Sequence, residues 1–246
     1  KFNLTIKKPD GDIAVKKGLD KDGYAGKEWN YKDNDGNYYL RWYVQASTNK
    51  GTGDKTVRIG DQLNGDSSGS FQSGSGVQVL GSYVENSVKV FKLKAGQNAP
   101  GNLVPSNEYK LTVSNENELS RFILVEDLPA LEPGESYILC YTTKVTPEEM
   151  NNKCKDNDGK IYNKGLAGIE DAPDVVTKDA TYVSFWRRLS KDGTLNKDGT
   201  ITWTITLKAA ANGYGEFLRG YTVKDVIPAG LTVKGDVTVE ADGENF

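Results

Sequence analysis

The chain has 246 residues, of which 37% are hydrophobic and 26% are charged, and its formal net charge is −3 at pH 7. This length suits one large or two ordinary domains, and the apolar content is sufficient for a core, which excludes wholesale disorder. The slightly acidic balance argues against nucleic acid and anionic membranes as partners, and no run of about 18 apolar residues offers a membrane span. Because the chain contains no histidine, Ser-His-Asp and Cys-His mechanisms are excluded.

Alternating apolar and polar residues, typical of half-buried strands, recur along the chain. In chain order we expect strands at 38–45 (YYLRWYVQ), 57–63 (VRIGDQL), 87–91 (SVKVF), 121–128 (RFILVEDL), 137–145 (YILCYTTKV), 201–207 (ITWTITL) and 221–227 (YTVKDVI). Turn-forming Asp-Gly pairs lie between them, at 10–11, 22–23, 35–36, 158–159, 192–193 and 198–199. The Gly- and Ser-rich stretch 64–76 predicts a surface loop, and only 147–152 suggests a helical turn. The sequence therefore predicts an all-β fold.

A weak internal repeat divides the chain. In the first half, a Lys-containing segment is followed by an Asp-Gly turn at 35–36, a Trp-containing strand and then VRIGDQL. In the second half, LSKDG is followed by an Asp-Gly turn at 198–199, the Trp-containing strand TWTITL and then YTVKDVIPAGL. This shared order of elements predicts two modules. We place the junction at the Gly-, Asp- and Pro-rich GIEDAPD stretch, which gives a first module at 1–172 and a second at 173–246 that stops before its expected later strands.

Three polar residues of the first module share a strand face with apolar neighbours: Lys17, Asp61 and Asn163. Burial disfavours the charge of a lysine, and the neutral amine is a nucleophile. A buried aspartic acid that keeps its proton can polarise an asparagine carbonyl by donating a hydrogen bond. Attack on that carbonyl would expel ammonia and leave a Lys–Asn isopeptide crosslink, formed once and without a cofactor. A plain Lys–Asp salt bridge is the alternative interpretation of the same residues.

Two long stretches resemble the repeated modules of Gram-positive surface adhesins and pilins, the CnaA-like, immunoglobulin-related domains. They are LSKDGTLNKDGTITWTITL at 189–207 and LRGYTVKDVIPAGLTVKGDVTV at 218–239. In the first module, LGSYVENSVKVF and LEPGESYILCYTTKVT resemble the later strands of the same family. The resemblance implies tandem immunoglobulin-like β-sandwich modules, the second one truncated, with intramolecular isopeptide bonds.

In the first module, the resemblance implies a lysine on the first strand, an aspartate in the apolar-x-Asp strand and an asparagine near the end of the module. Lys17, Asp61 and Asn163 fill these roles, and Lys16 and Lys21 are alternatives for the lysine. The sequence around Asn163 matches the family pattern imperfectly.

In the second module, Lys191 and Asp225 fill the first two roles. The matching asparagine is expected beyond Phe246, because Asn245 comes too early in the topology. This second bond is therefore not expected to close within the given sequence.

The expected function is structural or adhesive, as an adhesin or pilin subunit that forms a stalk or a host-ligand-binding region. No enzymatic activity is expected apart from the single-turnover crosslinking, and no cofactor or metal. The partners would be a host extracellular-matrix protein or neighbouring pilin subunits, at the bacterial cell surface, with wall anchoring through a segment outside this chain. The alternative is a carbohydrate-binding or accessory module of a secreted glycan-active protein, with an aromatic face made of Trp29, Tyr31, Tyr38 and Tyr39.

The two cysteines, Cys140 and Cys154, are too few for a disulfide framework or a four-cysteine zinc site. They form one disulfide or stay as two thiols, and the sequence leaves both alternatives open. A thioester from Cys140 to a glutamine has no supporting signature. The acidic stretches 33–36 and 156–159 resemble pieces of calcium loops without the glutamate spacing, so we interpret them as turns.

Overall fold

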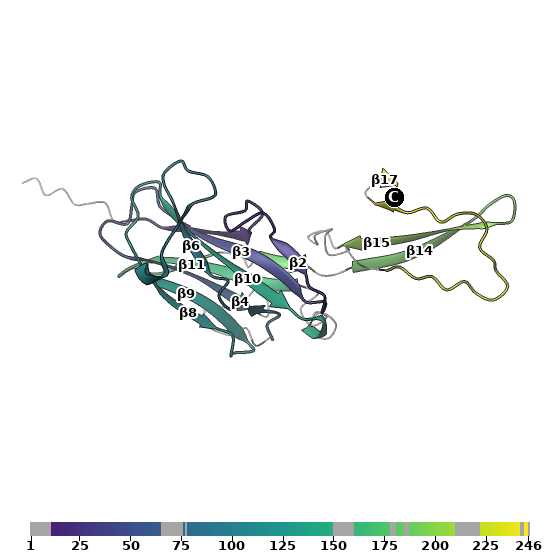
Figure 1. Cartoon of the computed structure of the whole chain (residues 1–246), viewed down its shortest axis with the longest axis horizontal. Helices are drawn as coiled ribbons and strands as arrows, with labels where there is room; N and C mark the ends of the chain where they lie inside the picture. The colour runs from purple at the N-terminus through teal and green to yellow at the C-terminus, as the bar shows by residue number, and fades with distance from the viewer. Residues whose placement is uncertain are drawn as a thin grey trace, which may run out of the picture.

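The computed structural model describes residues 11–64, 76, 78–149, 160–177, 181–184, 187–209, 222–241 and 244–245, and in these ranges strands dominate (Figure 1). The first sheet contains β1 (Ala14–Leu19), β2 (Asn30–Lys32), β3 (Tyr38–Ser47), β5 (Ser82–Tyr83), β6 (Lys89–Leu93), β7 (Asn102–Leu103) and β10 (Ser136–Val145). The second sheet contains β4 (Val57–Asn64), β8 (Lys110–Ser114), β9 (Ser120–Leu128), β11 (Lys160–Ile169), β12 (Val175–Val176) and β13 (Thr181–Ser184). The all-β prediction is confirmed.

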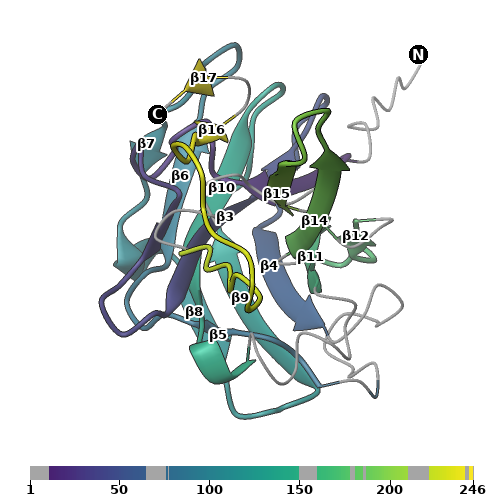
Figure 2. The ribbon, with the colours of Figure 1, turned by 90° about the vertical axis from the view of Figure 1, so that its right-hand side faces the viewer.

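The two sheets face each other as the layers of a sandwich (Figure 2). The first sheet has the order β1-β3-β10-β6-β7, with β2 paired to β3 and β5 paired to β10. The second has the order β12-β11-β4-β9-β8, with β13 also paired to β11. The strand pairs are antiparallel. A short 3₁₀ helix, η1 (Ser106–Glu108), precedes β8, and the expected helical turn appears at 147–149.

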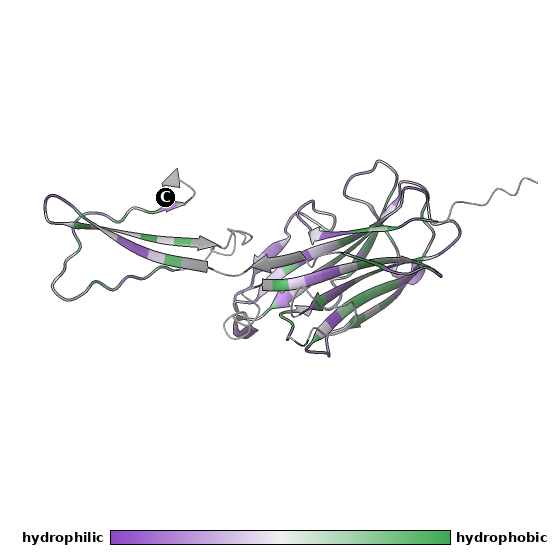
Figure 3. Cartoon of the chain, turned by 180° about the vertical axis from the view of Figure 1, so that it is seen from behind, coloured by the Kyte–Doolittle hydropathy of each residue, from purple (hydrophilic) through white to green (hydrophobic). Residues whose placement is uncertain are grey.

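The core lies between the two sheets and consists of the inward residues of each strand. Leu40, Trp42 and Val44 of β3 are completely buried, as are Ile59 of β4 and Ile123 of β9. Each such side chain stabilises the fold by about 1.5–3 kcal/mol relative to exposure. Figure 3 shows apolar and polar residues alternating along the strands, as expected for sheets with one face toward a core.

A second, smaller apolar cluster covers the outer face of the first sheet. It consists of Tyr43, Phe91, Leu93, Ile138 and Cys140, against which Tyr24 and Ala25 pack. The segment 20–26, between β1 and β2, is held over this cluster by the buried carboxylate of Asp20. That carboxylate accepts hydrogen bonds from the backbone amides of Tyr24 (2.7 Å) and Ala25 (3.0 Å) and from Nε of Arg41 (2.8 Å). Strand β10 is consequently buried on both faces.

The remaining strands form a hairpin that stands apart from the sandwich (Figure 1): β14 (Arg187–Leu195) and β15 (Ile201–Ala209), followed by β16 (Glu240–Ala241) paired with β17 (Glu244–Asn245). The expected Asp-Gly turn at 198–199 is confirmed, with Gly199 at φ 78°. The expected turn at 192–193 is wrong, because both residues belong to β14 and pair with Thr204 and Trp203 of β15. Position 193 has no room for a side chain, because a Cβ there would lie 2.6 Å from the Trp203 ring.

Two further expectations differ from the structure. The first sandwich continues past the predicted boundary at 172, because β12 and β13 both pair with β11. The strand expected at 221–227 is absent from its described part, since 222–239 has no ladder partner there and Val226 and Val237 are 75% and 82% exposed. Alternation alone does not make a strand where no neighbouring strand supplies backbone hydrogen bonds. None of the described helices is long and apolar enough to cross a membrane.

Candidate functional site

The sandwich brings together the three residues that the sequence singled out. Lys17 lies on β1 at the edge of the first sheet, while Asp61 and Asn163 lie on β4 and β11 of the second sheet. In the β4–β11 ladder Asp61 is opposite Gly165, and Asn163 is opposite Leu63. Asp61 and Asn163 are therefore offset by two residues across the pair, which places both on the same face of the sheet. This face is the one that meets the core.

The three side chains form a closed polar group with two tyrosines. Nζ of Lys17 donates to the Asp61 carboxylate and to the Tyr141 hydroxyl, and the side chains of Lys17 and Asp61 are 0% exposed. The other Asp61 oxygen, Oδ1, accepts a 2.8 Å hydrogen bond from the Tyr83 hydroxyl. Nδ2 of Asn163 donates to the Tyr141 hydroxyl at 3.1 Å. The amine, the carboxyl and the amide are thus held in one group that is buried from bulk solvent.

Burial shifts the protonation of this group toward neutral forms. Desolvation lowers the pKa of Lys17, although the charge of Asp61 acts in the opposite direction. Desolvation likewise raises the pKa of Asp61 against the charge of Lys17. It also raises the pKa of Tyr83 and Tyr141 well above the usual tyrosine value. The site therefore favours a neutral amine, a neutral acid and two intact hydroxyls.

The carbonyl oxygen of Asn163 is the unsatisfied atom of the site. Oδ1 is buried and has no hydrogen-bond partner among the described residues. An unpaired buried polar atom costs about 1–3 kcal/mol, so such atoms are rare in folded proteins. The amide is thus anchored by its nitrogen alone, and its carbonyl is free to accept a hydrogen bond from a protonated acid.

Aromatic and small residues enclose the lysine. Its Nζ lies 5.1 Å from the ring centroids of both Trp42 and Tyr141. The Trp42 indole is fixed by a 2.9 Å hydrogen bond to Oγ1 of Thr143. A Cβ on Gly165 would lie 2.9 Å from a Val44 methyl and 3.5 Å from Cβ of Lys17. A glycine at 165 therefore permits the close approach of β3 to β11, next to the strand that carries Lys17.

The structure separates the two alternative lysines from this group. Lys16 is exposed and has the opposite parity on β1, so it faces away from the core. Lys21 is exposed in the segment after β1, with its Nζ 5.1 Å above the Trp29 ring. Of the three lysines considered from the sequence, only Lys17 reaches Asp61.

The hairpin contains a similar but open arrangement. Nζ of Lys191 lies 2.8 Å from both carboxylate oxygens of Asp225 and 4.4 Å above the Trp203 ring. These two side chains are 32% and 27% exposed, in contrast to the sealed pair in the sandwich. Asn245 lies on β17, which pairs with β16. The described residues thus hold the lysine and aspartate expected for a second site, in contact with water.

The other residues considered from the sequence lie apart from this group. Cys140 is a free cysteine on the outer face of β10, where burial raises the pKa of its thiol; Cys154 lies outside the described residues. The 33–36 stretch is a turn in which Asp33 accepts hydrogen bonds from the backbone of its own loop. No cluster of three or more His, Cys, Asp or Glu suited to a metal occurs in the described parts of the chain. The 156–159 stretch is outside them.

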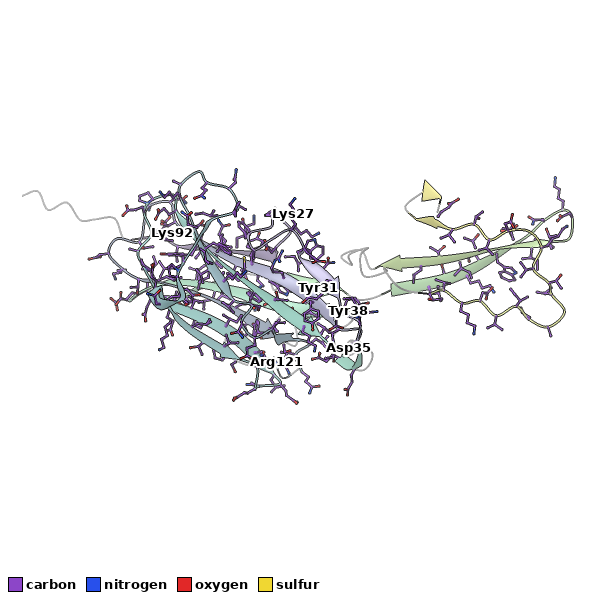
Figure 4. The ribbon with its side chains drawn as sticks, in the orientation of Figure 1. Lys27, Tyr31, Asp35, Tyr38, Lys92 and Arg121 are labelled. Carbon is purple, nitrogen blue, oxygen red and sulfur yellow. The ribbon has the colours of Figure 1, made fainter. Side chains whose placement is uncertain are left out.

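The four aromatic residues proposed as a sugar-binding face do not share one surface. Tyr38 belongs to the core and Trp29 packs against it. Tyr31 and Tyr39 stack on each other, with ring centroids 4.4 Å apart and an interplanar angle of 6°. Figure 4 shows where Tyr31 and Tyr38 lie on neighbouring strands. Two of the four rings therefore take part in core packing, so the four do not form one continuous binding face.

Sequence reasoning missed the two tyrosines of the site. Tyr141 lies in the expected strand at 137–145, but nothing in the pattern of that strand singled it out. Both faces of β10 are buried, so its apolar pattern does not identify the inner face. Tyr83 follows a loop on the two-residue strand β5, which is too short for a periodic signal.

No family model and no curated protein matches the chain. Among solved structures, it is similar to the collagen-binding domain of a Staphylococcus aureus adhesin, with 17% identity and a TM-score of 0.34 over 59% of this chain and 87% of that one. It is similar to ACE19, the collagen-binding subdomain of an Enterococcus faecalis surface protein, with 11% identity and a TM-score of 0.35 over 64% of this chain and 97% of that one. It is also similar to the major pilin SpaD of Corynebacterium diphtheriae, with 11% identity and a TM-score of 0.41 over 73% of this chain and 36% of that one. These similar structures are adhesin and pilin domains of Gram-positive bacteria.

Proposed function

We propose that this chain is a structural or adhesive module of a bacterial surface protein, in which Lys17 and Asn163 form an isopeptide bond promoted by Asp61. The observation that carries the proposal is the buried group of Lys17, Asp61 and Asn163, linked through the Tyr141 hydroxyl. A plain salt bridge would not need an asparagine amide beside it with an unpartnered carbonyl oxygen.

The chemistry requires only side chains of this chain. Lys17 passes a proton to Asp61, which leaves a neutral amine and a neutral carboxylic acid. The protonated Asp61 donates a hydrogen bond to Oδ1 of Asn163 and stabilises the negative charge that develops there. The amine attacks Cγ of Asn163, the bond from Cγ to Nδ2 breaks, and ammonia leaves. The reaction happens once per molecule, so the protein is not an enzyme in the ordinary sense.

The crosslink would serve mechanical stability. It joins the first strand of the sandwich to β11, the strand of the opposite sheet on which Asn163 lies. A covalent tie between the layers prevents their separation under load and restricts the unfolded chain, as a disulfide over a long loop does. Such a module fits a stalk or a ligand-binding region outside the cell. The sequence resemblance of 189–239 to adhesin and pilin modules supports this setting.

The partners follow from the same proposal: a host extracellular-matrix protein for a binding region, or neighbouring pilin subunits for a stalk. Binding of the purified chain to immobilised collagen, compared with an albumin surface, tests the first. Saturable binding to collagen alone would support a binding region. Its absence, together with a normal crosslink, would favour the stalk.

The crosslink is tested by the intact mass of the purified protein under reducing conditions. We expect the mass to fall short of the sequence mass by one ammonia, and Asp61→Ala and Asn163→Ala to restore the full mass. Asp225→Ala is the matched control and should keep the deficit, because Asp225 pairs with Lys191 of the hairpin and not with the buried group. A wild-type mass equal to the sequence mass would contradict the proposal.

A further inference from the structure

One hydroxyl contacts all three members of the proposed crosslinking group. The Tyr141 oxygen accepts hydrogen bonds from Nζ of Lys17 and, at 3.1 Å, from Nδ2 of Asn163. The Asp61 carboxyl is near enough to this hydroxyl to help raise its pKa. The two nitrogens thereby engage both lone pairs of the hydroxyl oxygen. Nζ of Lys17, which would attack, and Nδ2 of Asn163, which would leave, are thus both hydrogen-bonded to the Tyr141 oxygen.

Isopeptide formation requires a proton to travel between these two nitrogens. The attacking amine must lose a proton as its bond to carbon forms, and the departing nitrogen must gain one to leave as ammonia. Direct transfer would pass through a strained four-membered ring. A hydroxyl that accepts from one nitrogen and donates to the other relieves this strain, and such positioned acid–base groups accelerate reactions by about 10²–10⁴-fold.

We propose that Tyr141 is a catalytic residue of this crosslinking, in which its hydroxyl relays a proton from Nζ of Lys17 to Nδ2 of Asn163. This inference rests on the proposed function. As the bond from Nζ to Cγ forms, the Tyr141 oxygen takes one amine proton and gives its own proton to Nδ2. The bond from Cγ to Nδ2 then breaks and ammonia leaves. Nζ keeps one proton as an amide, and Tyr141 ends unchanged.

The surroundings of Tyr141 suit a relay rather than an ionised base. Its ring is completely buried, and this burial raises the pKa of the hydroxyl well above the usual tyrosine value. A neutral hydroxyl both donates and accepts, whereas a phenolate only accepts. The ring also packs edge-on against Tyr83, with centroids 5.4 Å apart, which fixes the direction of the hydroxyl.

Tyr83 has a different role, because it acts through Asp61. Its hydroxyl donates to Oδ1 of Asp61 at 2.8 Å and accepts from the backbone amide of Leu63 at 3.1 Å. This leaves Oδ2, the oxygen that contacts Lys17, as the one that receives the proton. Tyr83 is therefore a positioning residue.

The test compares Tyr141→Phe with Tyr137→Phe. Tyr137 lies on the same strand and the same face, is equally buried, and its hydroxyl donates to the backbone oxygen of Pro129 at 2.9 Å, away from the site. Each protein is made by cell-free synthesis and quenched in denaturant at intervals, and the fraction that has lost ammonia is read from intact mass. We expect Tyr141→Phe to slow crosslinking by about 10²-fold or more, and Tyr137→Phe to match the wild type.

Thermal unfolding of both variants shows whether each has folded. Should Tyr141→Phe not fold, 3-fluorotyrosine at position 141 keeps the hydroxyl and the packing while making the proton more acidic, and the same analogue at position 137 is its control. A change in crosslinking rate at 141 alone would support the relay. A wild type that loses ammonia, with an equal rate in every variant, would overturn the relay and leave the crosslink intact. A wild type that never loses ammonia would overturn both.

Discussion

The sharpest consequence of the proposed crosslink is mechanical, and Lys17→Met tests it. Methionine keeps the length and most of the volume of the buried side chain but removes the nucleophile. With the proposed bond in place, a pull on the two ends of the sandwich passes from Lys17 through that bond to Asn163. The chain between them is bypassed. In the variant that chain carries the load and extends once the sheets separate.

The size of the effect follows from the positions of the two residues. The bond closes a loop of about 145 residues, and an extended chain spans about 3.3–3.6 Å per residue. Unfolding of Lys17→Met should therefore release about 500 Å more chain than unfolding of the wild type. In the chain-entropy treatment a loop of this length also stabilises the folded state by about 5 kcal/mol.

Single-molecule stretching of the chain between attachments at its two ends measures this difference directly. Lys16→Met is the matched control, because Lys16 neighbours Lys17 in sequence yet is exposed and contacts no part of the buried group. We expect Lys16→Met to unfold with the short extension of the wild type. A wild type that releases the full length of the sandwich would refute the crosslink. A long extension in Lys16→Met would show that the wrong lysine had been assigned.

Three further changes probe the parts around the bond. Asp61→Asn keeps the shape of the side chain but cannot take up the lysine proton, so its intact mass should equal the sequence mass; a deficit of one ammonia would remove the acid from the mechanism. Gly165→Ala places a Cβ 2.9 Å from a Val44 methyl, so overpacking should destabilise the sandwich by about 1–3 kcal/mol in a denaturant titration, and an unchanged midpoint would contradict the tight approach of β3 and β11. Asp20→Ala releases segment 20–26, so iodoacetamide should modify Cys140 under native conditions while sparing the wild type; equal protection in both would show that other residues cover the thiol.

Much of the buried group could be predicted from sequence because strands obey a simple rule. A side chain two positions from an apolar neighbour shares its face, so Asp61 within VRIGDQL had to point inward. A carboxylate in that place needs a partner, which made the lysine and the asparagine worth seeking. The rule identifies the inner face only where the other face of the strand is exposed to solvent. On β10 the cover of segment 20–26 buries both faces, so Tyr141 could not be distinguished from Cys140 by pattern.

Pairing partners were less predictable than faces. Asp192 and Gly193 form a favoured turn dipeptide, yet they continue β14 because the Trp203 ring packs on the glycine. The alternating segment at 222–227 has the composition of a strand, but in the described residues no neighbouring backbone satisfies it. The module boundary was placed at a Gly- and Pro-rich stretch, whereas β13 returns to β11 after it. These outcomes depend on contacts distant in sequence, which local patterns do not contain.

The hairpin shows why the same residue types behave differently in the two places. Lys191 and Asp225 are paired at 2.8 Å, but both side chains are partly exposed to solvent, so their attraction is screened. Lys191→Ala should accordingly change the opening free energy of the β14–β15 amides by about 1 kcal/mol or less, measured by native-state hydrogen exchange. A loss of several kcal/mol would mean that the pair is sealed from solvent and chemically equivalent to the buried one. A loss of about 1 kcal/mol or less would mean that exclusion of water is what separates a reactive lysine from one in an ordinary salt bridge. Lys191 would then become reactive only when further strands bury it.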